Sequence, residues 1–304
     1  MLKPTVGNRF APLWLSTLCA CAVAIPEPVI PPPDPVDPPN EAELLAARGY
    51  TVTVPANYDE TRAWPLLIAL HGYGGTGQEL VRYFGLDRLA EQRGVFLLAP
   101  NGLQDGRGNR AWHPIHSHYP EWDVSWLTAV IHDLKAKYRI DASRVIVFGG
   151  SQGAHMAHRM GCDAADEVTA LISVAGQAPK NPADCTPTKP VTALEIHGTF
   201  DEVIGYYGDV QGATPDPNIG SAHDTVAVWA RNDGCTGELV EAAFSPIDIS
   251  TIVDGQETLV ELYAGCPAGV DVALWSMNGV PHRPGPTLDF ASRAYGFAAA
   301  RPRN

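Results

Sequence analysis

Basic residues are scarce in this sequence. Its 304 residues include 21 Lys and Arg against 34 Asp and Glu, which gives a formal net charge of −13. The basic residues form no cluster along the chain. Nucleic acids and anionic membrane surfaces are recognised through such clusters, so we expect neither as a partner. The acidic balance says nothing positive about a substrate.

An apolar run long enough to cross a bilayer is also absent near the N-terminus. Phe10–Leu18 is apolar but too short to span the membrane, and it follows a basic start, as in a signal peptide. The next residues, LCAC, resemble a bacterial lipobox. We therefore assign residues 1–21 as a lipoprotein-type signal peptide with lipidation at Cys21. Ordinary cleavage after Ala22 or Ala24 is the alternative, so we predict either a cell-envelope lipoprotein or a secreted protein.

Hydrophobic periodicity is missing from Pro26–Asn40, which reads PEPVIPPPDPVDPPN. Proline at this density favours an extended chain without a core, and we assign residues 22–40 as a linker. Residues 41–304 then form the folded domain. The 45% hydrophobic content suits one large α/β domain in this length, and no internal repeat is visible.

Metal-binding motifs are likewise absent. No C-x-x-C or H-E-x-x-H pattern occurs, and we interpret the histidines of the WHPIHSH segment, residues 112–118, as residues of a loop or cleft rim. We predict no metal and no other cofactor. Four cysteines remain outside the N-terminal segment, and an even number in an exported chain indicates two disulfides, with four free thiols as the alternative. They are Cys162, Cys185, Cys235 and Cys266.

Buried strands alternate with helical segments through the rest of the chain. Tyr50–Val54 alternates in polarity as an edge strand does. A helical stretch is expected after the glycine-rich loop that follows Pro65–Leu70, ending around Asp87–Arg93, and further helices are expected at three later places. This order predicts an α/β fold with a mainly parallel sheet covered by helices on both faces, which binds ligands at the carboxyl ends of its strands. The buried strands are Pro65–Leu70, Val95–Ala99, Arg144–Phe148, Ala170–Val174, Val191–Ile196 and Val270–Met277, and the later helices are Asp123–Tyr138, Ser221–Asn232 and Thr287–Ala299.

The central motif is the segment RVIVFGGSQGA, in which a strand ends in G-x-S-x-G and a helix follows. Such a strained turn presents a serine hydroxyl at the edge of the sheet, and its glycines make room for the tight packing. We predict that Ser151 is a nucleophile. The alternative is a glycine-rich turn with an ordinary serine.

A serine hydroxyl needs a base, and the base needs a carboxylate that orients it. Asp201 follows the strand VTALEI, and His282 follows the strand VDVALWSM, so both lie at strand ends after the serine in the chain order typical of this arrangement. Asp201 could instead be a turn carboxylate, and His282 a surface histidine. We interpret His197 as a packed histidine at a strand end, and expect helix geometry to point His155 and His158 elsewhere.

Acyl transfer also needs backbone donors for the developing oxyanion. We predict that one donor is the N–H of Gln152, the residue after the nucleophile. The other is expected in the glycine-rich loop after the strand PLLIAL, at Tyr73, with Gly74 as the alternative. His71 opens this loop and is expected to be structural.

Several stretches together resemble the secreted polyhydroxybutyrate depolymerase and feruloyl esterase group of α/β-hydrolases. They are LHGYGGTG, DVSWLTAVIHDLKAKYRIDASRVIVFGGSQGAHMA, HGTFDEVIGYY and the late Gly-x-Pro-His, and the similarity runs from Tyr50 to Phe297. The resemblance implies an α/β-hydrolase fold and an exported serine carboxylesterase. It implies Ser151 as nucleophile, Asp201 as orienting acid and His282 as base, and an acyl-enzyme formed from feruloyl, aryl or hydroxyalkanoate esters, small or polymeric.

The sequence departs from the group after the elbow, where Ser-Gln-Gly-Ala replaces the frequent Ser-Ala-Gly-Gly, and near His282. These changes fall in the expected substrate cleft and leave the substrate open. A serine peptidase of the same fold and a non-catalytic binding relative are the competing hypotheses. We expect a monomer. Four aromatic residues could form cleft walls or belong to the core: Trp112, Trp122, Tyr206 and Trp275.

The four cysteines lie where the group often has disulfides. We predict the pairs Cys162–Cys185 and Cys235–Cys266. Neighbouring crossovers in a parallel sheet bring the end of the elbow helix close to the start of the strand that delivers Asp201. The second pair would support the strand that delivers His282 in the same way.

Overall fold

The computed structural model describes residues 40–114, 122–208 and 220–303. Pro39–Asn304 forms one compact unit. The predicted signal peptide, Cys21 and most of the predicted linker lie outside the described residues, and so do His116 and His118. No helix within the described ranges is long and apolar enough to cross a membrane.

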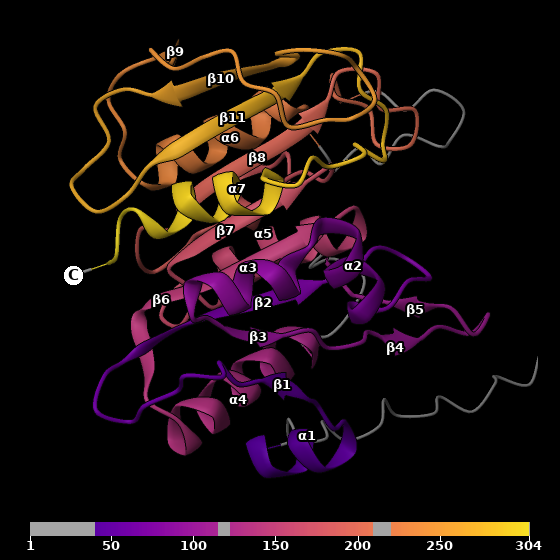
Figure 1. The fold of residues 1–304 in the computed structure, drawn as a ribbon, viewed down its shortest axis with the longest axis vertical. Helices are drawn as coiled ribbons and strands as arrows, with labels where there is room; N and C mark the ends of the chain where they lie inside the picture. Colours follow the sequence, from indigo (N-terminus) through magenta and orange to yellow (C-terminus); the bar gives the residue numbers. More distant parts are fainter. Residues whose placement is uncertain (1–39, 115–121, 209–219, 304) are drawn as a thin grey trace, which may run out of the picture. The chain divides into compact units, whose positions relative to one another are not determined.

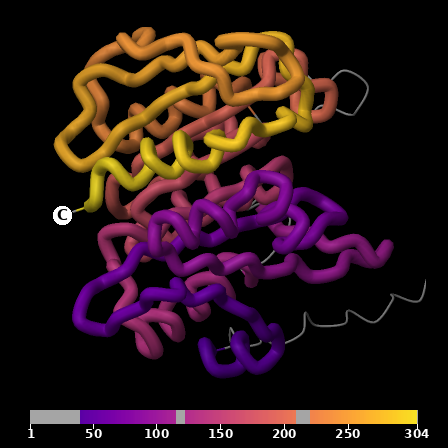
Figure 2. Tube along the Cα trace, viewed as in Figure 1, coloured from indigo at the N-terminus to yellow at the C-terminus, as the bar shows by residue number. Residues whose placement is uncertain are grey.

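A nine-stranded sheet runs through the domain, with its N-terminal strands at one edge and its C-terminal strands at the other (Figure 2). The six central strands, β3, β2, β6, β7, β8 and β11, run parallel to one another. At the edges of the sheet, β1, β10 and β9 pair antiparallel. This confirms the predicted mainly parallel sheet. In sheet order the strands are β1 (Val52–Thr53), β3 (Phe96–Leu98), β2 (Trp64–Leu70), β6 (Ile140–Gly150), β7 (Ala170–Val174), β8 (Thr192–Gly198), β11 (Val272–Met277), β10 (Thr258–Tyr263) and β9 (Leu239–Glu241).

Each face of the sheet has its own hydrophobic core, because successive side chains of a strand point to opposite sides. Leu66 and Ile68 pack with α4 (Trp122–Lys137), α5 (Gln152–Asp163) and α6 (Ala222–Asn232). Leu67 and Ala69 pack with α2 (Gly77–Phe84), α3 (Leu86–Arg93) and α7 (Phe290–Ala299), which cross the front of the sheet in Figure 1. The central strands read as continuous apolar runs because both of their faces are covered.

Local structure differs from the expectations in four places. The helical stretch before Arg93 is two helices, because Gly85 adopts φ 66° and ends α2. The segment expected to be irregular contains the hairpin of β4 (Leu103–Gln104) and β5 (Arg110–Ala111). The domain opens with α1 (Glu41–Ala47), which begins with a capping box between Asn40 and Glu43, and a short 3₁₀ turn spans Pro182–Asp184.

Both disulfides form with the predicted pairing. Cys162, in the last turn of α5, bonds to Cys185 across 23 residues, and Cys235, after α6, bonds to Cys266 across 31 residues. Loops of this size correspond to about 3 kcal/mol of stabilisation each, through the restricted unfolded chain. The first bridge supports the approach to β8, and the second supports the approach to β11.

One buried carboxylate lies at the end of α6, two residues before Cys235. Asp233 caps the end of α6, and its Oδ1 accepts a hydrogen bond of 2.9 Å from the N–H of Val191. Its Oδ2 is buried without a hydrogen-bond partner among the described residues. Burial therefore raises the pKa of Asp233 to about 7, against the weaker opposing effect of the Val191 bond.

This carboxylate predicts a pH dependence of stability. The folded protein retains the proton of Asp233 that the unfolded chain loses near pH 4. The free energy of unfolding should therefore fall as the pH rises from about 4 to about 7. The loss is up to about 4 kcal/mol. In Asp233→Asn this component should disappear, while Asp184→Asn at an exposed carboxylate should keep it. Urea unfolding at pH 4 and pH 8 measures the difference, and equal pH dependence in all three proteins would contradict the assignment.

Candidate active site

The turn between β6 and α5 holds Ser151 in a conformation that is rare for a residue with a side chain. Its φ is 55° and its ψ is −123°. A Cβ on Gly149 would lie 2.0 Å from the carbonyl oxygen of Gly153, and a Cβ on Gly153 would lie 2.0 Å from the carbonyl oxygen of Leu70. Only glycine fits at either position. The backbone on both sides of Ser151 is thus packed against itself and against β2, which fixes the serine at the carboxyl edge of the sheet.

Two side chains from distant loops meet Ser151 at this edge. Nε2 of His282 lies 3.0 Å from Oγ of Ser151, and Nδ1 of His282 lies 2.7 Å from Oδ2 of Asp201. Asp201 follows β8 and His282 follows β11, and these strands are parallel neighbours. The structure therefore brings together the three residues selected from the sequence. Nδ1–H of His282 faces an acceptor, so Nε2 is free to accept the serine proton.

Asp201 is held by its own loop as well as by His282. Its Oδ1 accepts hydrogen bonds of 2.8 Å from the backbone N–H groups of Val203 and Ile204. Burial alone would raise the pKa of Asp201, but hydrogen bonds from His197 and His282 outweigh burial and lower it well below its usual range. The side chain is therefore a carboxylate in a fixed orientation.

Behind Asp201 the structure contains a second ion pair that the sequence reasoning missed. Nε2 of His197 lies 3.2 Å from Oδ2 of Asp201, and Nδ1 of His197 lies 2.9 Å from Oε1 of Glu195. Glu195 and His197 alternate with Leu194 and Ile196 along β8, so their side chains occupy core positions on the α5–α6 face. Two charged residues at core positions of a buried strand are the signal that could have revealed them.

The backbone N–H groups of Tyr73 and Gln152 are among those near Ser151 that have no hydrogen-bond partner within the described residues. The loop that carries Tyr73 passes close to Ser151 at Gly72, where an added Cβ would lie 3.2 Å from Cβ of Ser151. Buried His71 fixes the loop: its Nε2 accepts from the N–H of Gly102, and its Nδ1 donates to the carbonyl of Gly72.

Trp112 and Gln152 link the two sides of this site. The indole N–H of Trp112 donates to the carbonyl of His71, and the backbone N–H of Trp112 donates to Oε1 of Gln152. Arg48 stacks on the Trp112 ring and pairs with buried Asp123, whose other oxygen binds His113. The Gln152 side chain thus has a structural partner, which leaves its backbone N–H directed by the start of α5.

A cleft of about 890 Å³ opens over Ser151 and His282. Its aromatic lining comes from Tyr73, Tyr83 and Phe84 of the loop after β2 and of α2. The aromatic residues proposed from the sequence do not line it, since Trp112, Tyr206 and Trp275 are buried in or beside the core and Trp122 is exposed at the start of α4. For the three buried residues, the alternative of a core role is correct.

The chain is similar to known ester hydrolases. Residues 56–211, half of the chain, match the model of the phospholipase/carboxylesterase family. The chain belongs to this family. It is a carboxylic ester hydrolase with the α/β-hydrolase fold, related to the feruloyl esterases.

Curated relatives of this esterase carry matching names. A protein of Nocardia uniformis subsp. tsuyamanensis named "Putative esterase NocK" is 28% identical over 97% of this chain and 94% of its own length. Feruloyl esterase B of Piromyces equi is 27% identical over 78% of this chain and 43% of its own length. Among solved structures, an acetyl xylan esterase from Aspergillus awamori has 17% identity and a TM-score of 0.55, and covers 81% of this chain and 93% of its own.

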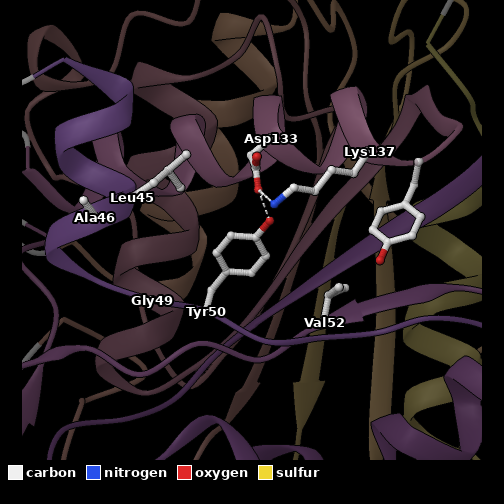
Figure 3. A pocket seen from close by; sticks show the side chains of 8 residues that line it. Leu45, Ala46, Gly49, Tyr50, Val52, Asp133 and Lys137 are labelled. Carbon is white, nitrogen blue, oxygen red and sulfur yellow. Dashed lines mark hydrogen bonds and ion pairs between the residues drawn. The ribbon is translucent and has the colours of Figure 1, made fainter.

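The esterase has a second cavity of about 550 Å³ between α1, β1 and α4 (Figure 3). The hydroxyl of Tyr50 and Nζ of Lys137 both donate to Oδ2 of Asp133 there. This cavity contains none of the candidate reacting groups. Over the described residues, no cluster of three or more His, Cys, Asp or Glu could hold a metal ion.

The tight packing of the turn at Ser151 predicts that a side chain at Gly153 destabilises the esterase. Gly153→Ala should destabilise the fold by at least about 3 kcal/mol, because backbone atoms of β2 cannot move away from the added methyl group. Gly106→Ala is the matched control, since no atom lies within 4 Å of its added Cβ. Thermal unfolding of both variants measures the effect, and similar melting temperatures would contradict the packing described.

Proposed function

We propose that the protein is an exported serine esterase in which Ser151, His282 and Asp201 form a catalytic triad acting through an acyl-enzyme. The proposal rests on two consecutive hydrogen bonds. Oγ of Ser151 lies 3.0 Å from Nε2 of His282, and Nδ1 of His282 lies 2.7 Å from Oδ2 of Asp201. The assignment of these hydrolytic roles fits the family to which the chain belongs.

The geometry supports a two-step reaction. Nε2 of His282 takes the Ser151 proton while Oγ attacks the ester carbonyl carbon, and the resulting oxyanion collapses as the alcohol leaves with the proton from His282. Water then attacks the acyl-enzyme, again giving its proton to His282, and the acid is released as the Ser151 hydroxyl re-forms. Asp201 stays ionised throughout and stabilises the imidazolium that forms in each step.

We assign the oxyanion hole to the backbone N–H groups of Gln152 and Tyr73. Both lack other hydrogen-bond partners among the described residues, and the loop carrying Tyr73 passes beside Ser151. The N–H of Gln152 begins α5, so the positive end of the helix dipole adds to the donor. The buried bonds of His71 keep the loop from moving when charge develops, so little reorganisation is needed.

For the substrate we propose esters of aromatic acids, of the feruloyl type. The cleft presents the rings of Tyr73 and Tyr83, and Tyr83 is held in place because its hydroxyl accepts from the N–H of Gly285 while Arg283 stacks over its ring. An aryl acyl group can pack against such rings, whereas a short hydroxyalkanoate gains less from them. Relatives named feruloyl esterases support the same class.

Export is part of the proposal and is supported by the disulfides. Bridges of this kind persist in oxidising compartments, which agrees with the signal sequence predicted over residues 1–21. Lipidation at Cys21 would make the protein a cell-envelope lipoprotein, and mass spectrometry of the N-terminal peptide from membrane fractions tests this. Other partners are not part of the proposal.

The triad predicts the behaviour of the nucleophile variant. Ser151→Ala should lower kcat by roughly three to six orders of magnitude and leave the melting temperature nearly unchanged, because only residual binding and oxyanion stabilisation remain. Hydrolysis of p-nitrophenyl acetate and labelling by a fluorophosphonate measure both effects. A folded variant with near-normal turnover, or label found on another residue, would exclude this triad and favour a binding or different catalytic role.

The aromatic cleft predicts a substrate-dependent effect. Tyr83→Ala should lower kcat/KM for methyl ferulate about tenfold or more, and for p-nitrophenyl acetate by no more than about threefold, because only the larger acyl group reaches the ring. The acetate ester serves as the internal control for folding and chemistry. Equal losses on both esters, or faster hydrolysis of hydroxybutyrate oligomers or of a peptide amide by the unmodified enzyme, would contradict the proposed substrate class.

A further inference from the structure

Beyond Asp201, the polar contacts of the candidate triad continue into the core through an ion pair with His197. His197 links Asp201 to Glu195, with separations of 3.2 and 2.9 Å from its two ring nitrogens. Oε2 of Glu195 lies 3.3 Å from Nε2 of His158, and Nδ1 of His158 accepts a 2.9 Å bond from the indole of Trp229. Glu195, His197, His158 and Trp229 are at most 1% exposed.

The partners of each ring determine where the protons lie. An indole N–H can only donate, so Nδ1 of His158 is unprotonated, and the ring's proton is on Nε2, facing Glu195. His197 faces only acceptors: Oε1 of Glu195, Oδ2 of Asp201 and the carbonyl of Ile204. Both of its nitrogens therefore donate, and His197 is an imidazolium.

The electrostatics agree with this protonation. Burial lowers the pKa of His197, but the hydrogen bonds and charges of Asp201 and Glu195 outweigh burial and raise it to about 9. Burial likewise raises the pKa of Glu195, and its bonds to His158 and His197 bring it below the usual value. Three buried charges of alternating sign, negative, positive and negative, thus lead from the core to the base.

We propose that Glu195 and His197 form a positioning pair that orients Asp201 and weakens its attraction for the protonated form of His282. The proposal rests on the triad proposed above. His282 donates to Oδ2 of Asp201, and Nε2 of His197 lies 3.2 Å from the same oxygen, so the positive charge on His197 opposes a second positive charge on His282. Glu195 lies on the far side of His197 and keeps it charged in a dry environment.

The other groups that face this pair add no charge of their own. His155 on α5 is neutral, because burial lowers its pKa to about 4, and burial keeps Tyr206 protonated by raising its pKa to about 12. His158 is neutral through its bond from Trp229, which α6 supplies. The neighbouring strands present the hydroxyl-bearing residues Ser173 on β7 and Ser276 on β11.

Two variants test the pair through the pH profile of the reaction. His197→Gln keeps a side chain that can donate to Asp201 but removes the positive charge, so His282 should be protonated more easily. The acidic limb of kcat/KM for p-nitrophenyl acetate should then move up by about one pH unit. Glu195→Gln combined with His197→Gln removes both charges, and its limb should also move up, by less than in the single variant but by more than about 0.2 pH unit, because the lost positive charge was the nearer one.

A matched control comes from the surface of α4. His132 also bonds two carboxylates, Glu41 and Glu167, but lies outside the site, so His132→Gln should leave the limb in place. A purely structural role for His197 would reduce kcat/KM equally at every pH. If His197→Gln does not fold, the double variant decides, since it leaves no unpaired ion in the core.

The outcomes separate this inference from the function on which it rests. Limbs of the folded variants that stay within about 0.2 pH unit of the unmodified enzyme, or that move down, would overturn the positioning pair. Ser151→Ala and His282→Gln measured on the same substrate report on the triad itself. Should those two retain turnover, the proposed function fails, whatever the His197 variants do.

Discussion

The steric contact between the elbow glycines and β2 is the constraint on which the site depends. Gly149 packs on Gly153, and Gly153 packs on Leu70, with no space for a methyl group at either contact. These contacts tie β6, α5 and β2 together at one point and leave Ser151 half-buried at the apex of the turn. The strained φ of 55° at Ser151 is retained because its surroundings allow no relaxed alternative.

The parallel sheet then determines which other residues can reach the serine. β8 and β11 are neighbours in register, so the loops that follow them leave the sheet at the same edge. Asp201 and His282, 81 residues apart in sequence, meet across that short distance. The disulfides lie at the opposite, incoming ends of these two strands, where they restrain the chain without entering the cleft.

The sequence could predict those features that depend on strand ends and on residue spacing. G-x-S-x-G after an apolar run, an aspartate after one strand and a histidine after another require only the topology of a parallel sheet. The two polar residues of VTALEIHG indicate charge at core positions of the strand, but they do not predict that Glu195 and His197 pair with each other and with Asp201. Their meaning depends on His158 and Trp229, which come from two other helices. The hairpin of β4 and β5 was missed because each strand has only two residues.

The difference between features fixed by strand ends and features that depend on packing between elements also explains why the reaction class is easier to derive than the substrate. The proposed reacting groups are attached to strand ends whose positions the core fixes. The cleft wall is built by Tyr73, Tyr83 and Arg283, which come from a loop, a helix surface and the segment after His282. Trp112 and Trp275, which the sequence offered as wall or core residues alike, are buried because loop packing and strand alternation place them in or beside the core. In the proposed function, substrate choice therefore depends on side chains outside the core, and these can change while the elbow and the proposed acid and base stay where the sheet holds them.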